Sequence, residues 1–243
     1  MTSPAYDLWY WPSIQGRGEF VRLFMAAAGI PYRDRARTDD AQALVEDMEA
    51  REKSGQFAPY APPYLVEREM GFAIAQVAHI LTWLTDKHDL DSGDPATDLH
   101  LIQLQLTITD IVAEVHDTHH PVASGLYFDD QKDAAKRAAK AFREERIPKY
   151  FDHFEAALSV KPGPFMVGAT WSHVDTSLFQ LVEGLRYAFP LRMAAITDDY
   201  PKLMACRDAV AEIEGVASYL DSEARIPFNE DGIFRHYEEL DAA

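Results

Sequence analysis

The chain has 243 residues, of which 47% are hydrophobic, so it can build the core of one large or two small domains. Forty acidic residues against 23 basic ones give a net charge of −17, which repels nucleic acid and anionic lipid. No apolar run approaches the roughly 20 residues that span a bilayer, and Met1 to Ala5 lacks signal-peptide features. The single cysteine, Cys206, excludes an internal disulfide and fits a reducing compartment. We therefore expect a cytoplasmic globular protein with neither a nucleic-acid nor a membrane partner.

The first predicted elements are a strand and a helix joined by a turn. Tyr6 to Trp11 is aromatic, which favours a strand, and Pro12 ends it because proline cannot donate to a strand ladder. After Gly16 the apolar residues recur at helical spacing: Phe20, Val21, Phe24, Met25 and Ala28. The first turn of a helix has unpaired N–H groups, which stabilise an anion. Tyr10 lies at the mouth of this turn, where we expect the chemistry.

The next segments alternate between strand and helix. A second strand is predicted from Tyr32 to Arg35, and a charged helix from about Ala41 to Lys53. Tyr64 to Val66 and Phe72 to Ile74 flank a polar turn, which indicates a hairpin. A helix then follows, with an apolar face at Val77, Ile80, Leu81 and Leu84. The alternation predicts a small sheet packed with helices.

A linker and an all-helical part are predicted beyond this point. We place the first domain at residues 1–88, the linker at 89–97 and an all-α domain with a C-terminal tail at 98–243. His100 to Asp117 is amphipathic, and Pro148 breaks a later helical run. Ser172 and Asp175 have the spacing of a helix cap. Cys206 falls in a late helix and is predicted to be a buried apolar residue rather than a nucleophile.

Three of these segments resemble cytosolic glutathione transferases. Tyr10-Trp11-Pro12 followed by Gly16-Arg17-Gly18-Glu19 and Arg22 resembles the family's opening, Pro63-Tyr64-Leu65 its cis-proline motif, and Gly168 through Asp175 its α-domain capping segment. Their order and spacing extend the resemblance over nearly the whole chain. The fold implied is an α/β thioredoxin-like N-terminal domain followed by an all-α C-terminal domain. The subfamily most similar is the bacterial, tyrosine type with a sigma-, mu- or pi-like N-terminal motif.

The resemblance also implies the glutathione site. Tyr10 is the expected partner of the thiol, with Ser13 as the alternative because the spacing from Tyr10 to Arg17 is one residue longer than in the family. The implied glutathione-binding residues are Trp11, Arg17, Pro62, Pro63, Gln76 and Val77. Two of them depart from the family pattern. Pro62 has no N–H for the cysteinyl backbone, and Val77 has no hydroxyl for the glutamyl end, so each change weakens glutathione binding by about 1 kcal/mol.

Side chains of the second domain are candidates for the second substrate. We name His116, His120, Tyr127 and Phe234 as electrophile-site candidates. A metal at His116, His119 and His120 is disfavoured, because Pro121 ends the turn that would hold the three ligands. Large apolar side chains also occur in the tail, between Ile226 and Tyr237, and we expect that segment to fold over the cleft between the domains as a lid.

The function implied is that of a detoxifying glutathione transferase, a cytoplasmic homodimer that activates the glutathione thiolate against a small hydrophobic electrophile. Glutathione is then a co-substrate, and no metal is required. A thiol-disulfide oxidoreductase would need a cysteine at the strand–helix turn, and residues 10–18 contain none. The alternative is a non-catalytic binding or scaffold protein of the same fold.

Overall fold

The computed structural model describes residues 4–55 and 57–243. These residues divide into two compact units. The first contains the residues up to Leu90 together with Ile213–Pro227, and the second contains Asp91–Glu212 and Phe228–Ala243. None of the helices in the described part of the chain is long and apolar enough to span a membrane.

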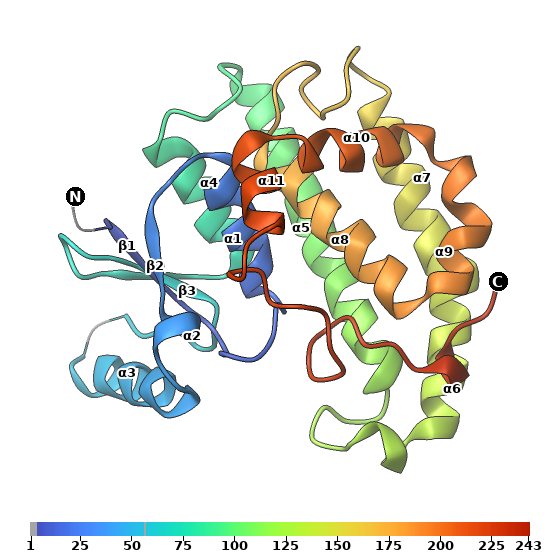
Figure 1. Ribbon diagram of the computed structural model, residues 1–243, viewed down its shortest axis with the longest axis horizontal. Helices are drawn as coiled ribbons and strands as arrows, with labels where there is room; N and C mark the ends of the chain where they lie inside the picture. The colour runs from blue at the N-terminus through green and yellow to red at the C-terminus, as the bar shows by residue number, and fades with distance from the viewer. Residues whose placement is uncertain (1–3, 56) are drawn as a thin grey trace. The chain divides into compact units, whose positions relative to one another are not determined.

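In the part that the structure describes, the first unit is a four-stranded sheet with helices (Figure 1). Its strands are β1 (Tyr6–Trp9), β2 (Tyr32–Asp34), β3 (Tyr64–Glu67) and β4 (Ala73–Ala75). Its helices are α1 (Gly18–Ala27), α2 (Arg35–Thr38), α3 (Ala41–Lys53), α4 (Val77–Lys87) and α11 (Glu214–Leu220). The strand order is β2-β1-β3-β4; β1 is parallel to β2 and antiparallel to β3, which is antiparallel to β4. The predicted strand–helix–strand–helix–hairpin–helix order is confirmed.

Alternating side chains divide the sheet into two buried faces. Trp9, Tyr64 and Val66 form one cluster with Leu44 of α3. Because successive residues of a strand point to opposite faces, the intervening Leu8, Leu65 and Ile74 are buried on the other side. There α4 packs on β3 and β4, and α1 packs on α4. Tyr10 follows Leu8 at a spacing of two, so it lies on the α1 side.

The first strands are shorter than predicted. β1 ends at Trp9 rather than Trp11, and β2 ends at Asp34, where the short helix α2 begins. The cause at β2 is a cap that the sequence analysis did not include: the Asp34 carboxylate accepts from the Ala36 N–H at 3.0 Å. The predicted α3 is confirmed, and Asp40 caps it through the Ala43 N–H at 2.9 Å. Tyr10 therefore leaves the sheet just before the turn to α1.

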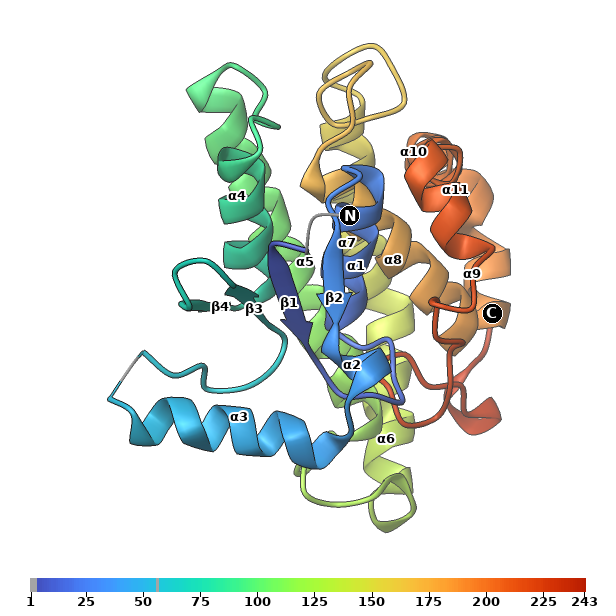
Figure 2. The same ribbon diagram turned by 60° about the vertical axis from the view of Figure 1, so that its left-hand side comes forward.

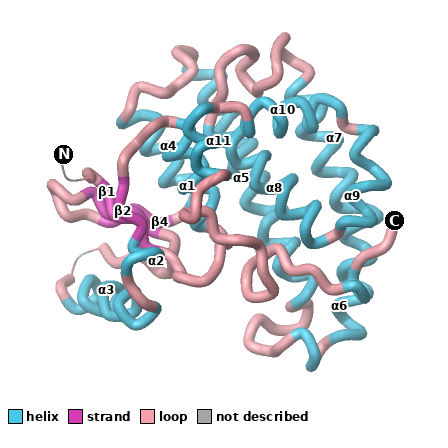
Figure 3. The backbone as a smooth tube through the Cα atoms, viewed as in Figure 1, coloured by secondary structure: helices cyan, strands magenta, loops and turns pink. Residues whose placement is uncertain are grey.

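The second unit is built from helices (Figure 3). They are α5 (Pro95–His119), α6 (Lys132–Ala141), a π-helical turn (Phe142–Arg146), α7 (Ile147–Leu158), α8 (His173–Ala188), α9 (Pro190–Ile196) and α10 (Pro201–Ala211). Short 3-10 turns occupy Phe128–Asp130, Thr197–Asp199 and Glu238–Leu240. α5 starts five residues before the predicted His100, because Asp94 caps the Thr97 N–H and Pro95 fits the first turn. Pro148 lies in the first turn of α7, at the predicted break.

The predicted capping segment begins the central helix α8. Asp175 is fully buried, and its carboxylate accepts from the backbone N–H of Ser172 at 2.7 Å and of Met166 at 2.8 Å. The thiol of Cys206 lies 3.3 Å from the same carboxylate. Burial raises the pKa of Cys206 well above its ordinary value, so the predicted buried, unreactive cysteine is confirmed.

The C-terminal residues are divided between the two units. α11 packs on α1 in the first unit, although the sequence analysis assigned residues 213–227 to the all-α domain. The contact is so close that a Cβ at Gly215 would collide with the carbonyl oxygen of Ala26. In the second unit, Phe234 is 2% exposed and its ring lies on Gly184. Phe234 therefore belongs to the core of the second unit.

We predict that Gly215→Ala destabilises the protein. Alanine gains up to about 1 kcal/mol in a helix, but here its methyl group meets backbone that cannot rotate away, so α11 must shift. We expect the free energy of unfolding in urea to fall by about 1–3 kcal/mol. Gly125→Ala is the matched control, because a Cβ there meets open space. Equal stability of the two variants would show that α11 is not held against α1.

We also predict that His173 makes the second unit acid-sensitive. This side chain is buried in the first turn of α8. Burial lowers its pKa from 6.5 to about 4 and outweighs the opposing effects of Asp98 and the Leu101 backbone. The unfolded chain therefore binds a proton that the folded chain excludes, and stability is lost as the pH falls from 6.5 to 4. His173→Leu should remove about 3 kcal/mol of that loss in urea titrations at a series of pH values. His100→Leu, at an exposed histidine, is the control.

Candidate functional site

Three strand ends bring Tyr10, Pro63 and Gln76 into one row. Trp9 pairs with Tyr64, and Tyr64 pairs with Ala75, both in antiparallel register. One further step along these registers places Tyr10 opposite Pro63 and Pro63 opposite Gln76. Figure 2 shows β1, β3 and β4 side by side, and neighbouring strands lie about 4.8 Å apart. The row joins three of the predicted site residues from distant parts of the sequence.

Tyr10 is held against the first turn of α1. Its hydroxyl oxygen accepts from the backbone N–H of Arg17 at 2.9 Å, and its side chain is 5% exposed. Gly16 and Gly18 make room for the ring: a Cβ at Gly16 would collide with the hydroxyl oxygen, and one at Gly18 would lie 2.8 Å from the ring. Gly16 also has a φ of 46°, which favours glycine. The two glycines of the motif are therefore needed for tyrosine packing.

The surroundings keep Tyr10 neutral. Burial raises its pKa, and this outweighs the N–H of Arg17 and the charges of Arg17 and Arg22, which lower it. The Arg22 guanidinium lies 6.0 Å from the centre of the ring. Within the described residues, the bond from Arg17 is the hydrogen bond that this hydroxyl makes, so its own proton is free to be donated. Tyr10 can thus act as a neutral donor beside fixed positive charge.

The other members of the row present backbone groups. The peptide bond between Pro62 and Pro63 is cis, as the resemblance implied. Pro62 offers only its carbonyl. Gln76 is exposed and has φ 72° and ψ 119°. Residues other than glycine adopt this backbone conformation at a cost of about 1–3 kcal/mol. It precedes Val77, the first residue of the 11-residue helix α4, whose first-turn N–H groups favour an anion. Strain at this position is typical of a ligand-binding residue.

The loop between β1 and α1 holds the remaining candidates of the first unit. Trp11 is 38% exposed, and Ser13 is exposed in the turn that follows Pro12. Arg17 is half-buried and already uses its backbone N–H on Tyr10. Ser13 lies outside the row of strand ends. The structure therefore brings Tyr10, Pro63 and Gln76 together and leaves Trp11 and Ser13 in the loop beside them.

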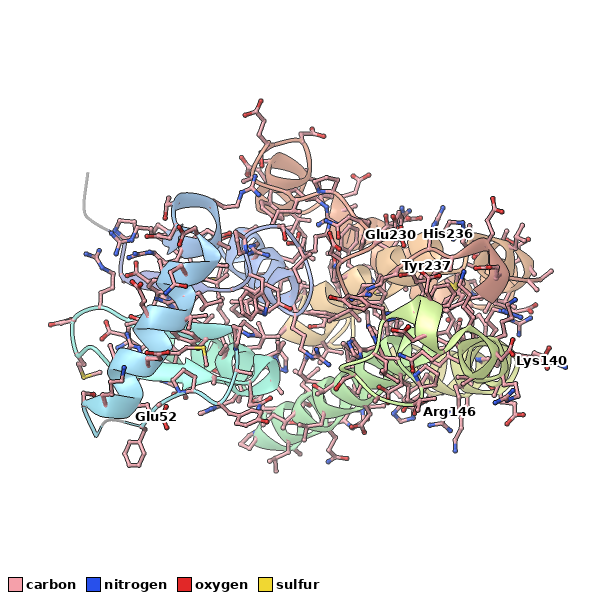
Figure 4. The ribbon with its side chains drawn as sticks, turned by 90° about the horizontal axis from the view of Figure 1, so that it is seen from below. Glu52, Lys140, Arg146, Glu230, His236 and Tyr237 are labelled. Carbon is pink, nitrogen blue, oxygen red and sulfur yellow. The ribbon has the colours of Figure 1, made fainter. Side chains whose placement is uncertain are left out.

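Three of the second-unit candidates line one pocket of about 680 Å³, namely His116, His120 and Tyr127. Glu230 and Tyr237 of the C-terminal segment, both labelled in Figure 4, line it as well, together with Arg235. The rings of His116 and His120 stack with their centres 4.8 Å apart. Phe234 is not part of this wall, because it is buried against Gly184.

His119 contacts the rings of His116 and His120 but is itself buried. It is 1% exposed, and its Nε2–H donates to the Ile233 carbonyl at 2.9 Å, which anchors the C-terminal segment. Burial lowers its pKa to about 3, so the imidazole stays neutral. His120 uses Nδ1 on the Leu126 carbonyl at 2.9 Å. Across residues 4–55 and 57–243, no three His, Cys, Asp or Glu side chains are arranged to hold a metal ion.

Comparison with known proteins finds similar chains. Residues 116–223 match the family model described as the glutathione S-transferase C-terminal domain. Glutathione S-transferase A3 of Mus musculus is 25% identical over 219 residues, which cover 89% of each chain. S-crystallin 4 of Enteroctopus dofleini is 24% identical and covers 93% of this chain and 100% of its own. Among solved structures, the pi-class glutathione S-transferase of Onchocerca volvulus has a TM-score of 0.71 at 19% identity and covers 94% of this chain and 99% of its own.

The chain has the glutathione transferase fold. The family model matches part of the second unit, and the relative from Mus musculus, similar at 25% identity, bears the glutathione transferase name. A second solved structure, prostaglandin synthase D of Nilaparvata lugens, aligns with a TM-score of 0.68 at 18% identity over 93% of this chain and all of its own. The predicted fold is confirmed.

This glutathione transferase fold also contains a site feature that sequence reasoning missed. Glu19 and Arg22 of α1 are both fully buried and 3.3 Å apart, and Arg22 binds Asp34 at 2.7 Å. Their spacing of three residues on one helix was the available signal for the first pair. Glu19 also contacts Tyr219 and Arg225. These two residues are about 200 positions away in the sequence, where no local pattern could point to them.

Proposed function

We propose that the protein is a tyrosine-type glutathione transferase in which Tyr10 activates the thiol. The observation that carries this proposal is the buried Tyr10 hydroxyl, which accepts from the Arg17 N–H and keeps its own proton for a ligand. It lies in one row with Pro63 and Gln76, the positions that the resemblance assigns to the cysteinyl and γ-glutamyl parts of glutathione. Glutathione would then lie along the strand ends of the first unit.

The chemistry follows from charge. A thiol is weakly ionised at neutral pH, and the thiolate is the nucleophile. A neutral hydroxyl that donates to sulfur stabilises the thiolate through a charge-assisted hydrogen bond. The nearby charges of Arg17 and Arg22 act in the same direction. The thiolate then attacks the electrophile and forms a new bond from sulfur. In a substitution the leaving group departs with its bonding electron pair, and in an addition to a polarised double bond the resulting carbanion takes up a proton.

The remaining glutathione contacts are assigned by position. Gln76 can hydrogen-bond the glutamyl carboxylate or amine, and the α4 N-terminus favours the carboxylate. Val77 contributes its N–H, and Pro62 its carbonyl. Trp11 shapes the pocket, and Arg17 binds an anion or supports packing. The missing N–H of Pro62 and hydroxyl of Val77 predict binding roughly tenfold or more weaker than in a site with both groups.

The pocket in the second unit is our candidate for binding the electrophile. His116, His120 and Tyr127 line it, and the rings of Phe128 and Tyr237 stack beside them with centres 4.0 Å apart. Such a wall offers flat aromatic surface to a small hydrophobic electrophile. Phe234 is removed from this assignment, because its buried ring cannot reach a ligand.

A homodimer and a cytoplasmic, detoxifying role complete the proposal. Phe57 is 100% exposed and Tyr60 is 95% exposed in the first unit, and Leu99 and Leu106 are exposed on α5 of the second. Large apolar side chains in water favour an interface with another chain. The single cysteine fits the reducing cytoplasm.

The rival hypothesis is a non-catalytic binding or scaffold protein. It is favoured by the incomplete glutathione contacts at Pro62 and Val77. One of the relatives, S-crystallin 4, does not bear the name of a transferase. Retention on immobilised glutathione together with turnover of a generic electrophile separates the two hypotheses, because a scaffold protein would show no turnover.

We predict that Tyr10→Phe raises the pKa of bound glutathione and lowers turnover by roughly 10²-fold, because the donor to the thiolate is lost. Ser13→Ala should change both quantities little. Difference absorbance of the thiolate and steady-state kinetics across pH measure the two effects. A large loss in Ser13→Ala with an active Tyr10→Phe would transfer the catalytic role to Ser13.

We predict that Val77→Ser tightens glutathione binding by about 0.5–1.5 kcal/mol, because the added hydroxyl supplies a hydrogen bond, and that Gln76→Ala weakens it. Isothermal titration calorimetry measures both. Gln42→Ala, an exposed glutamine on α3, is the control and should bind like the wild type. If neither Val77→Ser nor Gln76→Ala alters the affinity, the γ-glutamyl group binds elsewhere.

A further inference from the structure

A buried ionic network joins the helix start that holds Tyr10 to the C-terminal part of the first unit. Its centre is the Glu19 carboxylate, which is fully buried. The Tyr219 hydroxyl contacts its two oxygens at 3.0 and 3.1 Å, and the Arg225 guanidinium donates to it at 2.8 Å. A carboxylate out of water needs such partners, because an unpaired buried charge is strongly destabilising. Tyr219 and Arg225 therefore keep Glu19 in place.

Arg22 extends this network to the tyrosine. Its guanidinium donates to Glu19 at 3.3 Å and to Asp34 at 2.7 Å, and it lies 6.0 Å from the centre of the Tyr10 ring. Its Nη1 also donates to the carbonyl of Gln15 at 3.4 Å. The charges of Arg22 and Arg225 balance those of Glu19 and Asp34. Among the titratable groups, Tyr32 of β2 and Tyr219 also feel these charges. Removing Arg225 would leave a net negative charge close to Tyr10.

A second contact holds the same turn. The Gln15 side-chain amide donates to the carbonyl of Ile226 at 2.5 Å, and both residues are buried. The backbone N–H of Glu19 donates to the carbonyl of Gln15 at 3.1 Å. The turn from Gln15 to Glu19 contains Arg17, whose N–H binds Tyr10. The segment from Tyr219 to Ile226 thus contacts both ends of the turn that positions the Tyr10 hydroxyl.

We propose that Tyr219 and Arg225 are positioning residues for Tyr10, acting through Glu19 and Arg22. They hold the Arg17 N–H and the Arg22 charge where both favour the ionised thiol. This inference rests on the proposed role of Tyr10 in binding sulfur. It gives the α11 segment a part in thiol activation, in addition to its packing on α1.

The test compares Arg225→Gln, Tyr219→Phe and Arg37→Gln with the wild type. Arg37 is the matched control, because it donates to the carbonyl of Glu223 on the same segment and not to the Glu19 carboxylate. In Arg225→Gln we expect the apparent pKa of kcat/KM to rise by about 0.5 to 1 unit, with kcat/KM about threefold to tenfold lower at pH 6.5 and near the wild-type value at high pH. Tyr219→Phe should shift it less, and Arg225→Lys should restore it. A purely structural role would lower kcat/KM equally at every pH.

Two further measurements make the result decisive. In a Glu19→Gln background, Arg225→Gln should cause no additional pKa shift, since the carboxylate through which it acts is gone. In the free protein, amide hydrogen exchange at Arg17 should be faster in Arg225→Gln and unchanged in Arg37→Gln. An unaltered pKa, additive effects with Glu19→Gln, or unchanged exchange at Arg17 would overturn the inference. Failure of the wild type to bind glutathione would instead contradict the proposed function, and the exchange measurement would still decide whether the segment positions the turn.

Discussion

The burial of Arg22 is the constraint on which the first unit depends. A guanidinium cannot lose its proton at any accessible pH, so its burial requires fixed anionic partners. Glu19 comes from the same helix, Asp34 from the end of β2, and the carbonyl of Gln15 from the turn before α1. Asp34 also caps α2. One side chain therefore fixes how the strand end, the turn and two helices meet.

Tyr10 is placed by that arrangement. It leaves β1 on the α1 side of the sheet, where two glycines leave room for its ring. Its hydroxyl oxygen accepts a hydrogen bond from the Arg17 N–H. The protein carries a net charge of −17, yet this corner contains arginines whose charges face the hydroxyl. Because these partners are buried, salt and surface charge screen them little. A strongly acidic protein can thus retain a local environment that suits a thiolate.

The second unit depends on interactions at the start of its central helix and along its C-terminal segment. Its central helix α8 is almost entirely buried, so its start must be satisfied internally, and Asp175 does this for the N–H groups of Met166 and Ser172. The C-terminal segment completes the unit: Phe234 covers Gly184, and Ile233 accepts from His119. Of the apolar tail residues, Ile226 is buried in the first unit, and Ile233 and Phe234 are buried in the second.

Local pattern was sufficient for much of this protein. Apolar periodicity, prolines and capping residues determined the order of strands and helices, the α8 cap, the buried Cys206 and the position of Tyr10 at a strand–helix turn, because each depends on neighbours a few residues away. The sheet register determined that Tyr10, Pro63 and Gln76 form a row. Helix packing in the second unit buries Phe234 in its core. Only the tertiary structure revealed that Tyr219 and Arg225 hold Glu19. No periodicity links residues some 200 positions apart, and the buried charge that selects them exists only once the chain has folded.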